Sequence, residues 1–268
     1  MGRRGADQGG WYTDRDRLRE QYDDAERLAV RIRTHARYRV GSRALSARVL
    51  ELLDARDGEL VADVACGPGA IYHPPLRALG ARVLGVDLSA GMVREAAGGC
   101  WAAVRADAQA LPLAGGSCDK VMCNHALYHV PDQVRALREL RRVTRPGGRV
   151  LLTTNSRRTM HQLREVTRRA AADLGRPPDP APVLPFALED VCTVRGVFPE
   201  ASVAEFGDVL AFPTARPVVE YVASGRAIDV PFAEALARRV QQVIDAEGAF
   251  RVETIAGCFV ADVGPRGR

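Results

Sequence analysis

Residues 61–70, Val-Ala-Asp-Val-Ala-Cys-Gly-Pro-Gly-Ala, join a short apolar run to a turn that contains Gly67 and Gly69. The run predicts a buried strand, and the two glycines allow a tight turn and a close approach of the backbone to a ligand. A Gly-x-Gly turn after a strand is a weak signal by itself, because ordinary connections between a strand and a helix use the same residues. Its meaning therefore depends on the rest of the chain.

Four further apolar runs follow this turn, at residues 81–87, 101–107, 120–124 and 149–154. Stretches compatible with helices separate most of them, and this alternation is typical of a parallel sheet with helices on both faces. The clearest helix precedes the last of these runs. Pro131 and Asp132 suit its first turn, and Pro146-Gly147-Gly148 is predicted to end it.

We predict an α/β fold with a Rossmann-like, seven-stranded, mostly parallel sheet, an N-terminal helical cap and a helical lid insertion. The predicted ranges are 1–55 for the tail and cap, 56–212 for the core, 213–247 for the lid, and 248–268 for the last strand and tail. Helical spacing begins at Thr13 or Asp14 in the cap. Beyond the core, helices are predicted at 158–174, 217–225 and 232–247, and strands at 202–212 and 250–263.

The strand ends carry the polar residues of interest, because ligands of open α/β sheets bind outside the carboxyl ends of the strands. Asp87 lies about 20 residues after Gly67, where an acid can accept both ribose hydroxyls of an adenosine cofactor. Tyr72 stands where a dinucleotide fingerprint needs its third glycine, which argues against a nicotinamide dehydrogenase. Asp63 favours a cationic or amino-acid-like ligand over a diphosphate.

Five linked segments resemble the core of class I S-adenosylmethionine-dependent methyltransferases of the ubiquinone/menaquinone and small-molecule type. VADVACGPGA at 61–70 resembles motif I, and GVDLS at 85–89 with Met92 resembles motif II. Residues 106–119, 124–132 and 137–152 resemble the rest of that core. The resemblance covers residues 57–157 in order and in spacing.

The resemblance implies that S-adenosylmethionine is the cofactor and S-adenosylhomocysteine the product. Four residues at the end of the first strand would hold the methionine moiety, namely Asp63, Ala65, Gly67 and Gly69. Tyr22 in the cap would close over the same end of the cofactor.

The resemblance also implies an adenosine site on the next two strand ends. Asp87 would bind the ribose diol, and Leu88 and Met92 would flank the adenine. Asp107 would accept from the adenine amino group, while Ala108 would donate its backbone N–H.

Asn124 and His125 would line the cofactor near its sulfonium. A hydroxyl or carbon-acid acceptor needs a base, whereas a neutral amine needs none, and His129 and His125 are the candidates for that base. The alternative for His129 is that it orients loops or lines the pocket. His73 precedes two prolines, and we interpret it as a satisfied surface or cap histidine, with the helix starting near residue 74.

The predicted function is transfer of a methyl group to O, N or C of a small molecule, with secondary metabolism as a setting. The alternatives are an RNA methyltransferase, which the pI of 9.1 favours weakly, and a methyltransferase-like protein with a different reaction. All but one of the 38 basic residues are arginine, and they alternate with acids, so we expect no nucleic-acid partner. Four arginines of the predicted lid either meet an acidic group of the acceptor or form a solvated face: Arg216, Arg226, Arg238 and Arg239.

The six cysteines form no C-x-x-C pair, so neither a metal site nor a disulfide framework is predicted. The polar N-terminus lacks the apolar segment of a secretory signal, and no apolar run has the length of a membrane span. We therefore expect a cytoplasmic protein that acts without a membrane, as a monomer or a homodimer.

Overall fold

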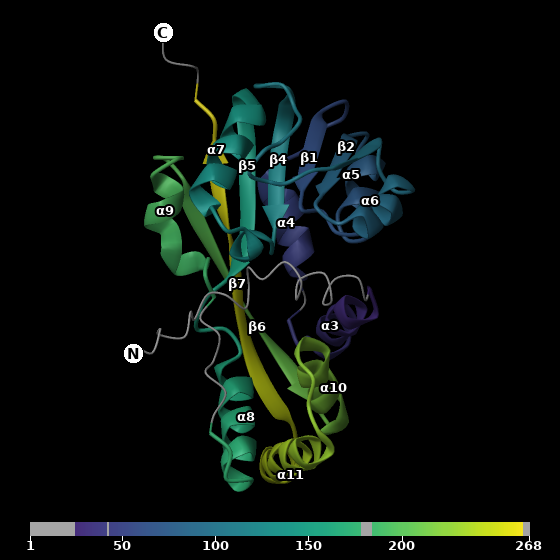
Figure 1. The fold of residues 1–268 in the computed structure, drawn as a ribbon, viewed down its shortest axis with the longest axis vertical. Coiled ribbons are helices and arrows are strands. Elements are labelled where there is room, and N and C mark those ends of the chain that lie inside the picture. Colours follow the sequence, from purple (N-terminus) through teal and green to yellow (C-terminus); the bar gives the residue numbers. More distant parts are fainter. Residues whose placement is uncertain (1–24, 42, 178–183, 265–268) are drawn as a thin grey trace, which may run out of the picture. The chain divides into compact units, whose positions relative to one another are not determined.

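The computed structural model describes residues 25–41, 43–177 and 184–264 (Figure 1). The predicted helix start at Thr13 and the predicted cofactor contact Tyr22 lie outside these residues. The described strands are β1 (Leu60–Val64), β2 (Arg82–Asp87), β3 (Ala102–Arg105), β4 (Cys118–Asn124), β5 (Thr144–Asn155), β6 (Ser202–Phe212) and β7 (Phe250–Asp262).

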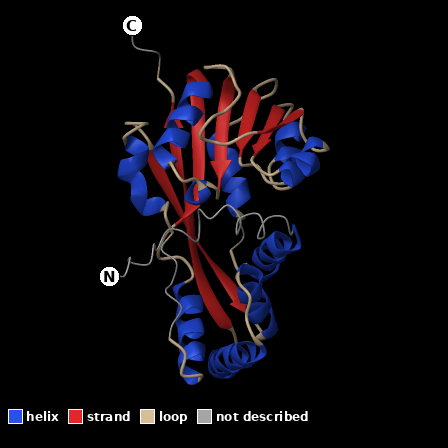
Figure 2. Ribbon diagram, viewed as in Figure 1, coloured by secondary structure: helices blue, strands red, loops and turns tan. Residues whose placement is uncertain are grey.

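The described helices comprise α3 (Ala25–Tyr38), α4 (Leu45–Leu53), α5 (His73–Ala78), α6 (Ala90–Ala97), α7 (Gln133–Val143), α8 (His161–Asp173), α9 (Val191–Arg195), α10 (Arg216–Gly225) and α11 (Val230–Glu247). Two single-turn 3₁₀ helices are η1 (Leu127–His129) and η2 (Leu188–Asp190). Figure 2 distinguishes helices from strands along the chain. Within the described part of the chain, no helix combines the length and the apolar composition that crossing a bilayer requires.

The described strands form one seven-stranded sheet in the order β3-β2-β1-β4-β5-β7-β6. Strands β1 to β5 pair in parallel with their neighbours, and β7 runs antiparallel to β5. The predicted α/β fold and mostly parallel sheet are therefore confirmed. The strand order reverses between β1 and β4, which is where open α/β sheets bind ligands.

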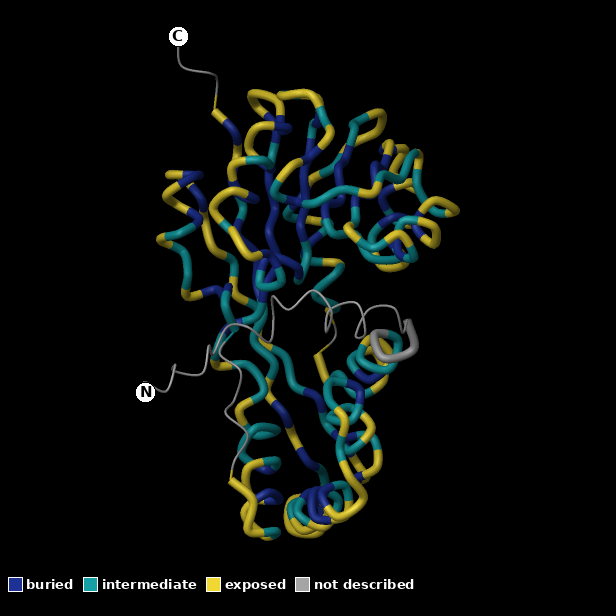
Figure 3. The backbone as a smooth tube through the Cα atoms, in the orientation of Figure 1, coloured by how far each residue is buried: buried dark blue, intermediate teal, exposed yellow. Residues whose placement is uncertain are grey.

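Alternate residues of the parallel strands face opposite layers of helices. On one face, Ala62 and Val64 belong to the core cluster that α7 and α9 cover. On the other face, Val61 packs in a cluster with residues of α4 and α5. Figure 3 shows buried segments in the central strands, which are β1, β2, β4 and β5, and exposed connections around them. Asp63 shares its face with Val61, so the alternation directs this acid toward α5.

The two ends of α7 differ from the sequence prediction. The helix begins at Gln133, and the Asp132 carboxylate caps it by accepting from the backbone N–H of Arg135 at 2.9 Å. Pro131 therefore precedes the helix instead of entering its first turn. The helix ends at Val143, before Pro146-Gly147-Gly148, which lies inside β5 beside an irregularity in the pairing with β4.

The chain divides into two compact units, which we describe separately. The sheet unit comprises residues 43–157, 184–206 and 256–268. The helical unit comprises residues 1–42, 158–183 and 207–255, and its described part includes α3, α8, α10 and α11. Strands β6 and β7 supply residues to both units. The four domain ranges predicted from the sequence stay a prediction.

Candidate functional site

The glycine turn after β1 has an unusual backbone. Ala65, Gly67 and Gly69 all have positive φ angles, of 57°, 56° and 71°. Glycine adopts this region without steric penalty, whereas Ala65 is strained there, and such strain gathers at functional sites. A β-carbon added at Gly67 would meet no described residue within 4 Å, so the described part of the chain leaves open space on that side of the turn.

Asp87 ends β2 and contacts this turn directly. Its Oδ2 accepts from the backbone N–H of Gly67 at 2.9 Å, and its Oδ1 accepts from the N–H of Ser89 at 2.8 Å. Burial raises the pKa of the Asp87 carboxyl, and these backbone bonds oppose the rise. Each carboxylate oxygen can accept more than one hydrogen bond, so Asp87 is fixed in place and retains acceptor capacity for a diol.

Leu88 and Met92 follow Asp87 and differ in exposure. Leu88 is 49% exposed, as expected of an apolar residue that a flat ligand group could cover. Met92 is 5% exposed and lies in α6, whose first turn the Ser89 hydroxyl caps by accepting from the Met92 N–H. Of the two predicted adenine contacts, Leu88 is thus at the surface and Met92 is in the core.

Gln109 holds the Asp107 carboxylate in the loop after β3. Its backbone N–H and its side-chain amide both donate to Asp107 Oδ1 at 2.9 Å. The Gln109 side-chain oxygen accepts from the N–H of Asp132 at 3.0 Å, which ties the loop to the start of α7. Ala108 lies between these residues and is buried.

Glu139 and Arg142 of α7 clamp the same loop further along. Glu139 accepts from the N–H of Leu111 at 2.8 Å, and Arg142 donates to the carbonyls of Leu111 and Leu113 at 2.9 and 2.7 Å. The side-chain hydrogen bond from Arg142 is the main reason that the pKa of Glu139 is lowered. This clamp was not predicted from the sequence, although an acid and an arginine three residues apart on one helix indicate an ion pair.

Asp63 and His73 form a buried pair beneath the glycine turn. Each of the two residues is 1% exposed, and His73 Nε2 lies 3.2 Å from Asp63 Oδ2. Burial raises the pKa of Asp63, while the hydrogen bond from His73 acts against that rise. The expected surface or cap position of His73 is therefore wrong, because the first residue of α5 turns its side chain toward β1.

Asn124 is the last residue of β4, next to β5, and His125 follows it. Thr153 donates its hydroxyl to Asn124 Oδ1 at 2.6 Å, and the His125 N–H donates to the Thr153 carbonyl at 2.8 Å. His125 has a φ of 51°, a second non-glycine residue in a strained conformation at a strand end. Among the described residues, the buried side-chain nitrogen of Asn124 has no hydrogen-bond partner.

His129 closes the single turn η1, which follows β4. Its backbone N–H donates to the Ala126 carbonyl at 2.8 Å, and its ring packs edge-on against Tyr128 with the ring centroids 4.5 Å apart. The side chain is partly exposed. His125 and His129 are thus both partly exposed beyond the end of β4, and the role of either as a base stays a prediction.

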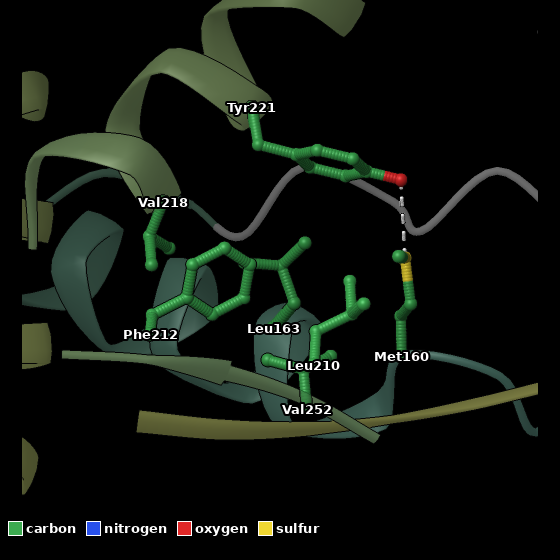
Figure 4. A pocket seen from close by; sticks show the side chains of 7 residues that line it. All are labelled: Met160, Leu163, Leu210, Phe212, Val218, Tyr221 and Val252. Atoms are coloured by element: carbon green, nitrogen blue, oxygen red, sulfur yellow. Dashed lines mark hydrogen bonds between the residues drawn. The ribbon is translucent and has the colours of Figure 1, made fainter. Parts of the chain in front are cut away.

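The helical unit contains a pocket with a different character (Figure 4). The lining is apolar apart from the Tyr221 hydroxyl, which donates to the Met160 sulfur at 3.5 Å. Burial raises the pKa of Tyr221, so this phenol stays neutral. The seven lining residues are Met160, Leu163, Leu210, Phe212, Val218, Tyr221 and Val252. All of them except Tyr221 belong to or pack against the apolar core of this unit, and none of the seven is a charged residue.

Three of the four arginines of the predicted lid make contacts within the helical unit, namely Arg216, Arg226 and Arg239. Arg216 pairs with Glu220 at 2.7 Å, and Arg239 pairs with Asp173. Arg226 lies over the ring of Phe232, 4.9 Å from its centroid. These contacts agree with the interpretation of Arg216 and Arg239 as a solvated face. Among the described residues, no cluster of three or more His, Cys, Asp or Glu side chains could hold a metal ion.

A family model described as a methyltransferase domain matches residues 62–152. That range contains the glycine turn, Asp87, Asp107 and Asn124. The match, the strand order and the acids at the strand ends together identify this part of the chain as a class I S-adenosylmethionine-dependent methyltransferase domain. The resemblance that the sequence motifs carry is thereby confirmed for the domain.

Curated relatives with this domain have different acceptors in their names. The chain is 38% identical over 144 residues to demethylmenaquinone methyltransferase of Thermobifida fusca, covering 51% of this chain and 57% of the relative. It is 35% identical over 175 residues to malonyl-[acyl-carrier protein] O-methyltransferase of Erwinia pyrifoliae, covering 64% of this chain and 63% of the relative. The chain thus spans less than two thirds of either relative.

The fold also recurs among solved structures. Phosphoethanolamine N-methyltransferase 2 of Haemonchus contortus, solved with S-adenosyl-L-methionine, superposes with a TM-score of 0.57 at 17% identity. The superposition covers 94% of this chain and 60% of the other. At this identity the likeness concerns the fold alone.

Proposed function

We propose that the chain is an S-adenosylmethionine-dependent methyltransferase that acts on a small molecule. The observation that carries the proposal is the Asp87 carboxylate, held by the Gly67 and Ser89 N–H groups at the end of β2. Two further observations on the described residues fit the same cofactor. The space beside Gly67 offers room, and the Asn124 side-chain nitrogen, which has no partner among these residues, offers a hydrogen-bond donor at a nearby strand end.

Each strand end would hold a different part of the cofactor. Asp63 and the turn from Ala65 to Gly69 would meet the methionine end, which carries a cationic amine. Asp87 would accept from the ribose hydroxyls, and Leu88 would cover one face of the adenine. The remaining proposed contacts are Met92, Asp107, Ala108 and Asn124, with Tyr22 outside the described residues.

When bound, the cofactor supplies a methyl group on a positively charged sulfur, which an acceptor in line with it can displace. The chain must therefore orient the acceptor and, for a hydroxyl or carbon acid, remove its proton. We propose that the imidazole of His129, which is partly exposed beyond β4, accepts the proton of such an acceptor. His125 is the second candidate for this base. An amine acceptor would need only positioning by the same residues.

We propose a small molecule as the acceptor class. The names of the two relatives give different acceptors, so neither of them fixes the particular acceptor of this chain. An RNA acceptor is the alternative, and the net charge of +5 favours it weakly. A methyltransferase-like protein with another reaction is the third option, because a fold does not determine a function. We further propose a cytoplasmic location and a monomer or homodimer.

Two measurements test the proposal. In isothermal titration calorimetry with S-adenosylmethionine, we expect binding at one site per chain. The absence of binding would refute the proposal. Incubation with methyl-labelled S-adenosylmethionine, first with a small-molecule extract and then with RNA, identifies the acceptor class. Label transferred only to RNA would favour the alternative.

His129→Ala tests the proposed base in the same assay. We expect a loss of labelled product by about 10²-fold or more with unchanged affinity for S-adenosylmethionine, because general-base catalysis contributes on this order. His161→Ala is the matched control, since that histidine lies on α8 with a side chain 56% exposed. Unchanged turnover in His129→Ala would show that the residue is not the base.

A further inference from the structure

His73 is the one residue at the start of α5 whose polar side chain is fully enclosed. Its backbone N–H donates to the Gly69 carbonyl at 3.0 Å, so the histidine is fastened to the glycine turn through its main chain. Its side chain is 1% exposed and points back under the turn. A polar ring is seldom enclosed in this way unless its nitrogens have partners.

The imidazole fills the space between the turn and the sheet. A β-carbon added at Gly69 would come within 2.1 Å of His73 Nδ1, and one added at Gly85 would come within 3.2 Å of its Cε1. The ring therefore contacts the backbone of the turn on one side and that of β2 on the other. Both glycines leave the room that the ring occupies.

The two ring nitrogens have different surroundings. Nε2 lies 3.2 Å from Asp63 Oδ2, whereas the buried Nδ1 has no hydrogen-bond partner among the described residues. A buried N–H without an acceptor is more unfavourable than a bare lone pair of the same ring. We therefore assign the proton to Nε2, which donates to Asp63, and the lone pair to Nδ1.

This donation favours the charged form of Asp63. Burial raises the pKa of the carboxyl, the nearby charge of Asp87 raises it further, and the hydrogen bond from His73 is the largest effect in the opposite direction. Without His73, Asp63 would take up a proton at a higher pH. The negative charge beneath the glycine turn therefore depends on the histidine.

We propose that His73 is a positioning residue for the cofactor, which supports Gly69 from below and keeps the Asp63 carboxylate charged toward the cationic methionine end of S-adenosylmethionine. This inference rests on the proposed function. It assigns His73 a role in binding, with no contact to the reacting atoms.

Two substitutions separate the hydrogen bond from the filling of space. His73→Leu keeps a side chain of comparable size but has no hydrogen-bond donor, whereas His73→Gln keeps an N–H donor at nearly the same reach. By calorimetry at pH 7.5, we expect the leucine variant to bind S-adenosylmethionine about tenfold more weakly, as for the loss of a hydrogen bond to a charged group. We expect the glutamine variant to stay within about threefold of the wild type on the same basis.

The pH profile supplies a readout that a purely structural role would not change. The titratable groups around the Asp63–His73 pair are Asp87, Cys66, Tyr72 and Cys123. Burial raises the pKa of each of them and of Asp63 itself. The two thiols and the phenol stay neutral at and below neutral pH, so the carboxyls dominate. In His73→Leu, the pH below which affinity falls should move upward, while His73→Gln should keep it near the wild-type value.

Nitrogen NMR of the imidazole tests the proton assignment without activity. The chain has five histidines, and the spectrum of His73→Gln identifies the His73 signals by their loss. We expect a protonated Nε2 and an unprotonated Nδ1. The reverse assignment would overturn the proposed donation to Asp63.

The outcomes distinguish the two proposals. If the wild type fails to bind S-adenosylmethionine, the proposed function fails. If the wild type binds and folded His73→Leu, checked by circular dichroism, binds equally well with an unshifted pH profile, the role of His73 is overturned. Equal weakening in both variants without a shift would also overturn it, because the donor would then make no difference.

Discussion

At the scale of single residues, Asp63 combines a carboxyl with a fully enclosed position, which affects folding as well as binding. Because burial raises its pKa, the folded state holds the Asp63 proton more tightly than the unfolded chain does. The associated stability is present below the unfolded pKa of about 3.9 and is lost as pH rises through the raised folded value. As the pH rises and Asp63 ionises, the free energy of unfolding of the apo protein therefore falls, and over the same pH range the proposed cofactor gains a negatively charged partner.

Asp63→Asn removes this titration and keeps a side chain of the same shape. We expect the free energy of unfolding of the variant, relative to the wild type, to increase between pH 4 and pH 7, because only the wild type must ionise a buried acid. Urea unfolding at several pH values measures the difference. A difference independent of pH would contradict the raised pKa.

Gly67 and Gly69 share a positive φ but differ in their surroundings. Gly67→Ala would be strained by about 1–2 kcal/mol with no clash, whereas Gly69→Ala would add a collision with the ring of His73. We expect Gly69→Ala to lose more stability in thermal unfolding than Gly67→Ala. We expect Gly67→Ala to fold and to bind S-adenosylmethionine more weakly, because its β-carbon enters the open side of the turn. Equal stability of the two variants would refute the packing of His73 against Gly69.

At the scale of secondary structure elements, α7 positions a loop that it does not adjoin in sequence. Glu139 and Arg142 hold the backbone at Leu111 and Leu113, a few residues after Asp107. The proposed adenine site thus depends on a helix that follows β4, although its own residues follow β3.

Glu139→Ala should release this loop. We expect a loss of stability of about 1 kcal/mol and faster hydrogen exchange of the Leu111 amide, since its acceptor is removed. Glu165→Ala on α8 is the matched control. Glu165 also pairs with arginines three and four residues further along its helix, but both of these partners lie in α8 itself and neither belongs to a loop. Unchanged exchange at Leu111 in Glu139→Ala would contradict the clamp.

The sequence predicted the elements that depend on local pattern. The apolar runs and the turn at Gly67 and Gly69 were sufficient for the parallel strands, and Asp87 does end the second strand, as predicted. The hydrogen bond of Asp87 with the glycine turn was not predicted from the sequence. The enclosure of His73 could not be predicted in this way, because Pro74 and Pro75 suggest an exposed helix start. Only the pairing of β1 with α5 across the turn brings that ring against Asp63.

The position of Pro146-Gly147-Gly148 inside β5 has a similar explanation. These residue types end helices, and the prediction that they stop α7 followed from this preference. The backbone of β5 accommodates them where the pairing with β4 is irregular, so tertiary pairing prevails over the local signal.

At the scale of the whole molecule, the proposed cofactor contacts among the described residues all lie in the sheet unit. S-adenosylmethionine at 100 times its dissociation constant should stabilise the protein by about 2.7 kcal/mol. We expect the hydrogen-exchange protection to concentrate in residues 63–69, 87–92, 107–113 and 124–125. Protection confined to the helical unit would contradict the assignment of the site.

The packing within the helical unit could not be predicted from the local sequence pattern. Its helices α8, α10 and α11 were each predicted from their periodicity, and they were confirmed as elements. Which of them share a core is decided by packing between segments distant in sequence. Residues such as Val166, Leu210 and Leu236 meet in one cluster although no local pattern links them.

The chain passes between the two units at five points, and at two of them it does so in the middle of β6 and β7. Neither unit can therefore be cut out at a linker or transplanted as a single cassette. A chimera with a relative would have to exchange residues 1–42, 158–183 and 207–255 together and would have to splice two strands in register. Change of the helical unit by recombination is thus restricted, and substitution within its helices is the route that the connectivity leaves open.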